Sequence, residues 1–498
     1  MTIHLSILLF FPLVLATLGA ALPRTVAPAA LLVGALVALA YSVLLLFDFE
    51  SGADGLQYVT DDSWIEELGV RYTLGIDGLN LWLVALTALL FAASALWICL
   101  RPPATRRKLY AFHLGLAETA VLGAFLAQDL ILFVLFFDLM LVPFYFLIGQ
   151  WGTGDRVAAT FKLVVYTLVG SLLMLAAAVA TGTMADAGAD GATSFSMAAL
   201  AAAPLEEDPQ RWIFAAFALA FLIKMPAFPF HGWMPDGYRS MPLPVLAVFS
   251  GVLSKVAAYG FLRVALPIFP DAVEDFQTVI LLLALVSILY GSAQAFTQTN
   301  VRLILGYSSV AQLGFITLGI FALGQAAGPQ GALLQMVNHG LVVAPLFFIT
   351  ALLVERTGSE DIREMGGVAF RAPILSTLFL IVALATLAMP GSANFAGEFL
   401  ILLGLFNTKL VIAIIAFTGV AMASVYMLRM FIRAVHNRVG AGVKSFDLSV
   451  RDGLVLVPLV LAIIAFAVYP QQALHDSEPA VERLVGGSEA VAQAEATP

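Results

Sequence analysis

Long apolar stretches follow one another along almost the whole chain, and short polar segments separate them. A helix needs about 20 mostly apolar residues to cross the hydrocarbon core of a bilayer. The pattern therefore predicts an all-α protein with about fourteen transmembrane helices in a single integral membrane domain, residues 1–498. The predicted spans are 4–22, 27–47, 78–100, 110–127, 129–150, 160–183, 212–232, 242–266, 275–297, 301–323, 331–354, 371–406, 409–432 and 452–470.

Two of the predicted spans contain residues that interrupt a helix. One break follows Lys224 in the run FLIKMPAFPFHGWMPD, and the other precedes Glu398 in the run ATLAMPGSANFAGEFL. Proline removes a backbone hydrogen bond and clashes with the preceding turn, so each helix is expected to stop at membrane depth. A pair of broken helices is typical of transporters whose ion path passes the breaks, and ordinary kinks are the alternative. The residues predicted to break the helices are Pro226, Pro229, Pro390 and Gly391.

The composition excludes an ordinary soluble protein. Hydrophobic residues make up 61% of the chain and charged residues 11%, and the mean hydropathy is +0.97. A soluble domain has roughly 45–50% apolar and about 25% charged residues. The single cysteine, Cys99, excludes an intrachain disulfide, a thiolate zinc site and a cysteine-ligated iron–sulfur cluster. The sequence therefore predicts no metal and no redox cofactor on this chain.

Charged residues are sorted by loop, so the net charge of -9 hides an asymmetry. Arginine and lysine gather in the connections at 101–108, 356–371 and 433–451, which share one side of the membrane when the spans are counted as above. The connections on the other side are acidic, as is the tail 471–498. Basic loops face the cytoplasm, so the chain is predicted to lie in a bacterial inner membrane with both termini outside.

Four ionisable residues lie well inside predicted spans, one in each span. A charge at the centre of a span costs about 2.5–3.5 kcal/mol on insertion scales, so four such residues need a partner or a function. Neither Lys224 nor Lys255 is close enough to a span end for its side chain to reach the membrane surface. We therefore expect these side chains to face one another along an ion path. The alternatives are a packing ion pair for the aspartate and an interhelical hydrogen bond for the histidine. The four residues are Asp138, Lys224, Lys255 and His339.

Two more titratable residues stand beside the predicted breaks. Glu398 is expected at the end of the path, with capping of its half-helix as the alternative, and His231 either caps the first break or carries protons. Lysine and histidine exchange protons near neutral pH once burial and a neighbouring charge act on them. No oxygen cage for a metal and no phosphate-binding loop is recognisable, so protons are the favoured ion. The histidines expected to be solvated are His4, His113, His436 and His475.

Longer motifs resemble one protein family. The run QDLILFVLFFDLMLVPFYFLIGQWG is followed by FKLVVYTLVGSLLMLA, FLIKMPAFPFHGWMPD, GVLSKVAAYGFLRV, YSSVAQLGF and GSANFAGEFLIL. This order is similar to the antiporter-like subunits of respiratory complex I (NADH-quinone oxidoreductase), which are related to Mrp-type antiporter subunits. The resemblance extends from about Tyr72 to Pro470. It implies two inverted repeats of about five helices each, near 110–266 and 275–432, and protonatable residues along the bilayer midplane.

The resemblance also assigns proton transfer to particular residues. Asp138 stands where the family has a glutamate on helix five, and Lys224 and Lys255 match its lysines on helices seven and eight. His339 matches a histidine on helix eleven, and Glu398 matches a glutamate on helix twelve. Sister subunits commonly have lysine at that last position, so this glutamate, with the run YPQQAL, favours the subunit M branch.

The chain departs from the family pattern at three places. Aspartate at 138 keeps the charge of the usual glutamate on a shorter side chain. Gln312 replaces a histidine; it cannot carry a proton but can orient water, and ordered water is expected between Lys255 and His339. The run at 236–239, Asp-Gly-Tyr-Arg, differs from the usual Asp-Ala-His-Thr and alters the cytoplasmic approach.

The resemblance implies partners and leaves alternatives. The partners would be the lipid bilayer and other membrane-arm subunits of complex I, with no nucleic acid. FMN, iron–sulfur clusters and quinone would be bound by partner subunits, so this chain would pump protons without redox chemistry of its own. The alternatives are an Mrp-type cation/proton antiporter subunit, a subunit of a ferredoxin- or hydrogenase-linked complex, and a structural spacer in the membrane arm.

Overall fold

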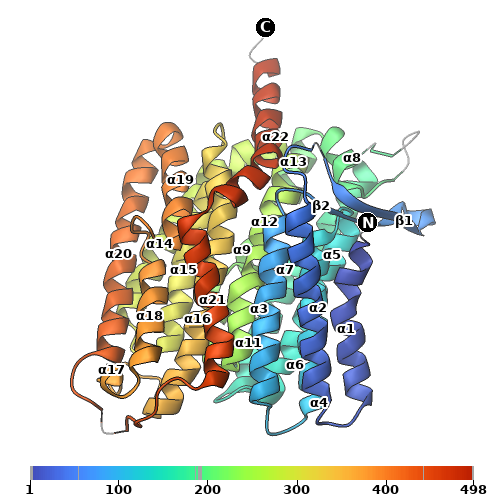
Figure 1. Ribbon diagram of the computed structural model, residues 1–498. Helices are drawn as coiled ribbons and strands as arrows, with labels where there is room; N and C mark the ends of the chain where they lie inside the picture. The colour runs from blue at the N-terminus through green and yellow to red at the C-terminus, as the bar shows by residue number, and fades with distance from the viewer. Residues whose placement is uncertain (1–3, 54, 186, 189–192, 441, 496–498) are drawn as a thin grey trace.

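The computed structural model describes residues 4–53, 55–185, 187–188, 193–440 and 442–495, and for 487–495 it describes the backbone alone. Most of the helices run alongside one another from one end of the molecule to the other (Figure 1). Among the described residues, eleven helices are long and apolar enough to cross a membrane. The prediction of a helical membrane protein is confirmed.

The eleven spans correspond to the longer labelled elements, two of which are composite. They are α2 (Ala27–Asp48), α3 (Leu81–Leu100), α4 (Arg107–Leu126), α5 with α6 (Leu130–Leu139 and Leu141–Trp151), α7 (Arg156–Met184), α11 through α13 (Leu243–Ile268), α14 (Pro270–Thr297), α15 (Val301–Ile320), α16 (Ala327–Thr357), α20 (Leu410–Val435) and α21 (Val450–Val468). Three shorter apolar helices accompany them: α1 (Leu5–Ala21), α18 (Pro373–Ala385) and α19 (Ala393–Thr408). A further helix, α9 (Glu207–Lys224), begins with charged residues.

The helices differ in how much of their surface the protein itself covers. The segment Val301–Ile320 is entirely buried and Leu243–Ile268 is buried except at Pro244, Arg263 and Pro267, whereas only about a third of α2, α20 and α21 is buried. Large aliphatic and aromatic side chains are exposed on these outer helices. Such a surface is compatible with lipid and not with water. The buried helices therefore form the centre of the bundle, and they include the one that carries Lys255.

Both predicted helix breaks are present. Helix α9 ends at Lys224, and the chain resumes in the short helices η3 (Phe230–Trp233) and α10 (Met234–Ser240). The freed carbonyl of Ile223 accepts a hydrogen bond of 2.9 Å from the indole Nε1 of Trp233, so the break is closed by a side chain. The second break separates α18 from α19, and Gly391 adopts a φ of +89° there. A residue with a side chain would be strained in that conformation.

The helix that carries Lys255 contains an irregularity that the sequence did not predict. Two π-helical segments, η4 (Phe249–Leu253) and η5 (Phe261–Ala265), flank the α-helical turns of α12 (Ser254–Gly260). Further turns precede and follow them in α11 (Leu243–Val248) and α13 (Leu266–Ile268). π-Helical turns are rare and are frequently found at functional sites. This helix is thus widened on both sides of its one lysine.

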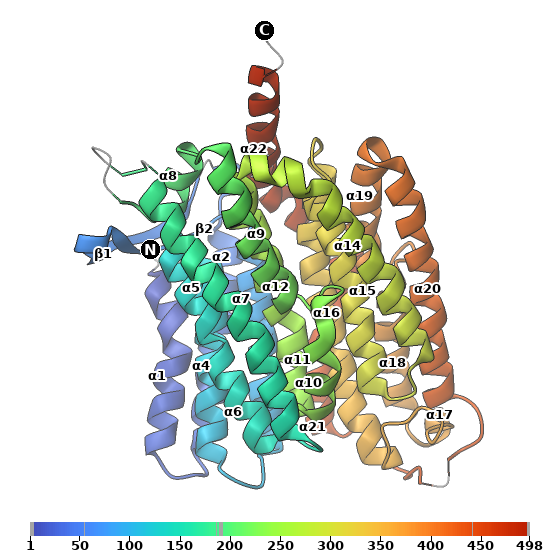
Figure 2. The same cartoon turned by 180° about the vertical axis from the view of Figure 1, so that it is seen from behind.

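Small elements cover the end of the bundle where both termini lie (Figures 1 and 2). The acidic segment expected to be loop forms an antiparallel hairpin of β1 (Gln57–Ile65) and β2 (Val70–Ile76), joined by η1 (Glu66–Leu68). Helix α8 (Met197–Ala202) lies nearby, and the acidic tail forms the helix α22 (Gln471–Glu495). The loops rich in arginine lie at the opposite end, which also carries the short helix α17 (Val368–Arg371).

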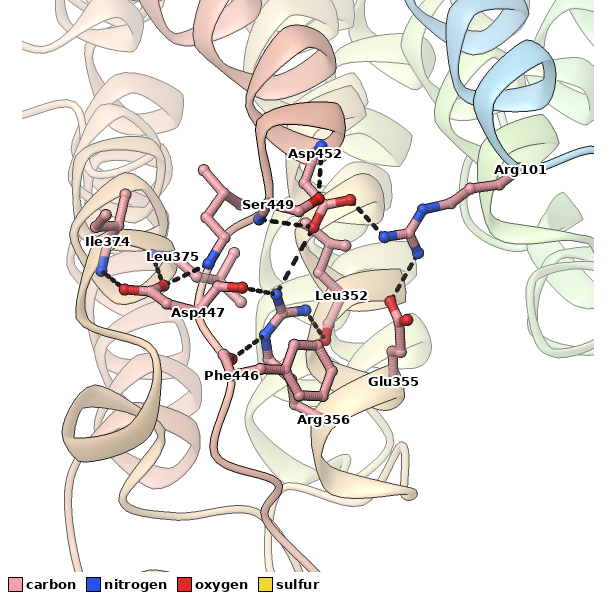
Figure 3. Close-up of polar contacts among 11 residues, drawn as sticks. Arg101, Leu352, Glu355, Arg356, Ile374, Leu375, Phe446, Asp447, Ser449 and Asp452 are labelled. Carbon is pink, nitrogen blue, oxygen red and sulfur yellow. Dashed lines mark hydrogen bonds and ion pairs between the residues drawn. The ribbon is translucent and has the colours of Figure 1, made fainter.

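At the end with the basic loops, a buried carboxylate joins distant helices (Figure 3). Asp452, at the start of α21, forms ion pairs with Arg101 at the end of α3 and with Arg356 near the end of α16, the latter at 3.7 Å. Asp452 is also part of a capping box with Ser449. Arg356 is fully buried, and its guanidinium donates to the carbonyls of Leu352, Phe446 and Asp447, while Asp452 supplies the opposite charge.

Replacing Asp452 with asparagine is expected to destabilise the bundle by about 1–3 kcal/mol, because it leaves the buried Arg356 without its carboxylate. Thermal inactivation of the assembled complex measures this effect as a lower midpoint. Glu355→Gln is the matched control, since Glu355 pairs with the same Arg101 at 2.6 Å but is 43% exposed. Exposed pairs contribute little, so the control should shift the midpoint hardly at all. Equal midpoints for the two variants would contradict a structural role for Asp452.

Candidate functional site

Lys224 lies at the end of the first half of the broken helix, next to α5. Its side chain is buried, and Nζ donates a short hydrogen bond to the backbone carbonyl of Phe137. Nζ also lies 3.6 Å from the centroid of the Phe137 ring, which is a cation–π contact. The break in α9 thus places an ammonium group inside the bundle, where one carbonyl and one aromatic ring face it.

Asp138 follows Phe137, the residue whose carbonyl accepts the hydrogen bond of Lys224. The side chains of Asp138 and Lys224 interact electrostatically, and Ser171 of α7 also faces the carboxylate. The side-chain oxygen Oδ1 of Asp138 is buried and has no hydrogen-bond partner, and the ion pairs within 4.0 Å among the described residues do not include Asp138 with Lys224. The predicted pair is therefore adjacent but not in direct contact.

Lys255 occupies the centre of the bundle. Its side chain is fully buried, and Nζ donates a hydrogen bond of 2.6 Å to the carbonyl of Ser250 in the π-helical segment η4. The Ser250 hydroxyl in turn lies 3.2 Å from the hydroxyl of Ser309 on α15. His339 on α16 is buried close enough for Lys255 to influence its charge, and its Nδ1 has no hydrogen-bond partner. Lys255 and His339 therefore lie within electrostatic range of each other, and a path through them stays a prediction.

Glu398 lies at the start of α19, after the second break, and is held by two amide side chains. Gln312 Nε2 donates to its Oε1 at 2.9 Å, and Gln335 Nε2 donates to the same oxygen at 3.3 Å. Gln335 also donates to the Oε1 of Gln312 at 2.8 Å. The other oxygen of Glu398 is buried without a partner. Gln312 was predicted to orient water between Lys255 and His339; in the structure it donates to Glu398, accepts from Gln335 and shares the wall of a small cavity with His339.

Small cavities adjoin two members of this series, Lys224 and His339. One of about 10 Å³ has Lys224 and Thr167 in its wall, and another of about 10 Å³ is lined by Gln312, His339 and Asn394. A space of this size accommodates about one water molecule. The series of titratable groups therefore has room for single waters beside the lysine of the first break and beside the histidine.

Two buried polar residues were not predicted from the sequence. Gln335 completes the amide cluster on Glu398, and Glu118 on α4 is fully buried with no partner for either carboxylate oxygen. Glu118 stands in the run GLAETAV, about nine residues into a predicted span, so its position as the only acid of that span was a usable signal. An uncharged amide such as Gln335 gives no comparable signal, because only its partners distinguish it from a packing residue.

The histidines are placed differently from expectation in one case. His231, beside the first break, is buried against the ring of Tyr290 at 4.9 Å, and its Nδ1 has no hydrogen-bond partner. His113 was expected to be solvated, and this prediction is wrong. It is buried in α4, with its ring stacked 4.6 Å from that of Phe146. The prediction rested on the position of His113 near the start of the predicted span 110–127. In the structure the ring of Phe146 on α6 covers it.

The departure at 236–239 lies at the end of the bundle with the basic loops. Asp236 of α10 forms an ion pair of 2.8 Å with Lys162, and each side chain is more than 40% exposed. Both groups are thus in contact with the surface. Tyr238 of the same run is buried, and its ring packs against Phe249 of η4 and Phe347 of α16, so the altered run extends from the surface into the bundle.

The fold and the buried groups define an integral membrane protein with titratable side chains beside two broken helices and on the central helix between them. Comparison with known proteins gives the particular family. A family described as NADH:quinone oxidoreductase/Mrp antiporter, TM, matches residues 127–464, and the chain belongs to this family.

Individual relatives agree with this assignment. The chain is 36% identical to NADH-quinone oxidoreductase subunit M of Rhodobacter capsulatus, over 97% of this chain and 96% of that protein. A chain of respiratory complex I from Thermus thermophilus superimposes with a TM-score of 0.87 at 30% identity, covering 97% of this chain and all of that one. A chain of the Mrp complex from Dietzia has a TM-score of 0.83 at 22% identity, which shows a shared fold.

Proposed function

We propose that this chain is a proton-translocating membrane-arm subunit of NADH-quinone oxidoreductase, of the subunit M type. Its likeness along nearly the full length to subunit M of Rhodobacter supports this assignment. The observation that carries it is the series of buried titratable groups running from the first helix break through the central lysine to the second break. Electron transfer would take place in partner subunits that bind FMN, iron–sulfur clusters and quinone.

The complete architecture is part of this proposal. Counting α1, α9 and the broken α18–α19 together with the eleven long spans gives fourteen membrane crossings. The breaks in α9 and between α18 and α19 support two inverted repeats, near residues 110–266 and 275–432. The chain would lie in a bacterial inner membrane with other membrane-arm subunits as neighbours. Its basic loops would face the cytoplasm and both termini the outside.

The transfer of protons would begin at Asp138 and Lys224. A carboxylate close to the lysine stabilises its ammonium form, and moving the two groups apart favours release of the proton. In this structure Lys224 already has a second acceptor, the carbonyl of Phe137, so it can leave the carboxylate without losing every hydrogen bond. The short aspartate side chain makes the separated arrangement easier to reach than a glutamate would.

The remaining steps would pass through the centre and the second break. Lys255 would receive the proton and hand it to His339, whose Nδ1 is available as an acceptor. Glu398 would be the last group, and its unpartnered oxygen is the site where a proton would bind. The amides of Gln312 and Gln335 hold the other oxygen and so fix the orientation of the carboxylate.

Purification tests the assignment directly. If the chain is extracted from its native membrane in mild detergent, subunits that carry flavin and iron–sulfur clusters should co-purify with it. The alternative is an antiporter subunit of the Mrp type, which the shared fold with the Mrp complex supports. Co-purification with other antiporter subunits and no redox subunit would favour that alternative, whereas a ferredoxin- or hydrogenase-linked assembly would bring iron–sulfur subunits without a flavin.

Substitution of Gln312 tests the far end of the path. Gln312→Leu is expected to lower coupled proton pumping several-fold, because Glu398 loses its closest donor and a hydrogen-bonding group is replaced by an apolar one. Gln312→His should be tolerated, since histidine donates to the same oxygen. NADH-driven quenching of a pH-sensitive dye in inverted membrane vesicles measures the effect. Normal pumping by Gln312→Leu would mean that the path does not depend on this residue.

A further inference from the structure

A large cavity opens at the end of the bundle where the termini lie. Its volume is about 470 Å³, and its apolar walls come from α8, α13, α14 and α22. Two charged residues in its lining, Asp77 and Arg263, are almost completely buried, with side chains 7% and 13% exposed. The cavity is therefore mostly apolar, with the buried pair Asp77 and Arg263 in its lining in addition to Glu274 of α14 and Arg483 of α22.

The buried pair belongs to a connected hydrogen-bonded group, which we call the Asp77 cluster and which consists of Asp77, Tyr259 and Arg263. Arg263 Nη2 donates to Asp77 Oδ1 at 2.5 Å, and Arg263 Nε donates to the hydroxyl oxygen of Tyr259 at 2.8 Å. The Tyr259 hydroxyl donates to the carbonyl of Phe125 at 3.0 Å. Arg263 thus occupies acceptor positions on both the carboxylate and the phenol.

The cluster lies one helical turn from Lys255. Residues 255 and 259 belong to the regular α-helical turns of α12, so their side chains share a face. The hydrogen bond between Arg263 and Tyr259 extends the same face into the π-helical segment η5. Lys255, Tyr259 and Arg263 therefore form a polar row over roughly 12 Å of helix rise. The row extends from Lys255 to Arg263 in the cavity wall, and the Lys255 ammonium itself is turned toward Ser250, in the opposite direction along the helix.

We propose that the Asp77 cluster is a closed gate between Lys255 and this cavity, and that the cavity is a proton vestibule on the outer side. The inference rests on the proposed function and adds a branch to it. In the closed state Arg263 fills the acceptor positions on Tyr259 and Asp77. When Arg263 withdraws, the Lys255 ammonium turns from the carbonyl of Ser250 and gives a proton to the Tyr259 oxygen, while the phenol turns from the carbonyl of Phe125 and passes its own proton to the Asp77 carboxylate. Lys255 becomes neutral, and the Asp77 carboxyl then releases the proton to water in the vestibule.

The gate predicts a leak when its arginine is removed. Arg263→Gln in the assembled complex should retain most donor:quinone reductase activity, but the pH gradient in membrane vesicles should be several-fold smaller and should collapse faster once the donor is exhausted. Arg211→Gln is the matched control, because Arg211 pairs with Asp275 at 2.6 Å at the same end of the bundle, exposed and outside the cavity lining. An assembled Arg263→Gln variant as proton-tight as the control would overturn the gate.

A labelling experiment tests the vestibule without altering the cluster. In a Cys99→Ser background, Ala201→Cys places a thiol in the cavity wall, and Trp212→Cys places one on an exposed position of α9 outside the cavity lining. A bulky, charged, membrane-impermeant thiol reagent added from the outer side should slow pumping several-fold for Ala201→Cys. A small methylthio reagent should leave the pumping rate of Ala201→Cys unchanged. Neither reagent should change the pumping rate of Trp212→Cys.

The outcomes separate this inference from the proposed function. If the Ala201→Cys adduct pumps at the unlabelled rate, the cavity is not on the proton route and the inference is wrong. If Lys255→Ala pumps normally, the proposed function is wrong, and the gate that rests on it is wrong as well. If Lys255→Ala loses pumping while the labelled Ala201→Cys variant pumps normally, the proposed function stands and only the gate is wrong.

Discussion

Lys255→Ala is expected to assemble normally and to lose both proton pumping and the quinone reductase activity coupled to it. Lys255 is fully buried on the central helix, and its Nζ has a single protein acceptor, the carbonyl of Ser250. An ammonium group in such a place is costly, so its removal should not harm folding, whereas α12 has no second amine that could take its place. We expect the largest loss of activity at this position.

The measurement is NADH-driven proton uptake by inverted membrane vesicles, with the amount of assembled complex determined on native gels. Lys444→Ala is the control, because Lys444 lies exposed in the loop before α21 and plays no part in the path. It should pump at the normal rate. An assembled Lys255→Ala variant that pumps as well as Lys444→Ala would show that protons bypass the central helix.

Asp138→Asn is expected to abolish coupled pumping without unfolding the bundle. The amide has nearly the shape of the carboxylate but no charge, so the ammonium form of Lys224 loses the group that stabilises it. Lys224 would then remain on the carbonyl of Phe137 and would no longer alternate between two partners. The proposed first step depends on that alternation.

Asp138→Glu serves as the conservative control, because it restores the family's usual side chain and keeps the charge. It should retain pumping, and its longer side chain should reach Lys224 directly. Pumping and reductase rates of the two variants, measured on equal amounts of complex, give the comparison. If the asparagine variant pumps at the normal rate, Asp138 is a packing residue and the switch is incorrect.

The sequence by itself determined the features that depend on local chemistry. Hydropathy identified the membrane helices, because a segment of sufficient apolar length partitions into a bilayer wherever it stands in the fold. Proline at 226 and 229 predicted the first break, since proline disrupts the helix in which it occurs. The residues at the site were recognised for the same reason: Lys224, Lys255 and Glu398 are charged in surroundings that are otherwise apolar.

Only the tertiary structure decided which of these groups meet. Gln312 and Glu398 are 86 positions apart, and Asp77 and Arg263 are 186 apart. Membrane helices are apolar on nearly every side, so their sequences do not distinguish a face that contacts lipid from one that contacts another helix. For this reason the burial of Glu118 and His113, the contact of Lys224 with a carbonyl instead of Asp138, and the π-helical turns around Lys255 depend on how the helices pack.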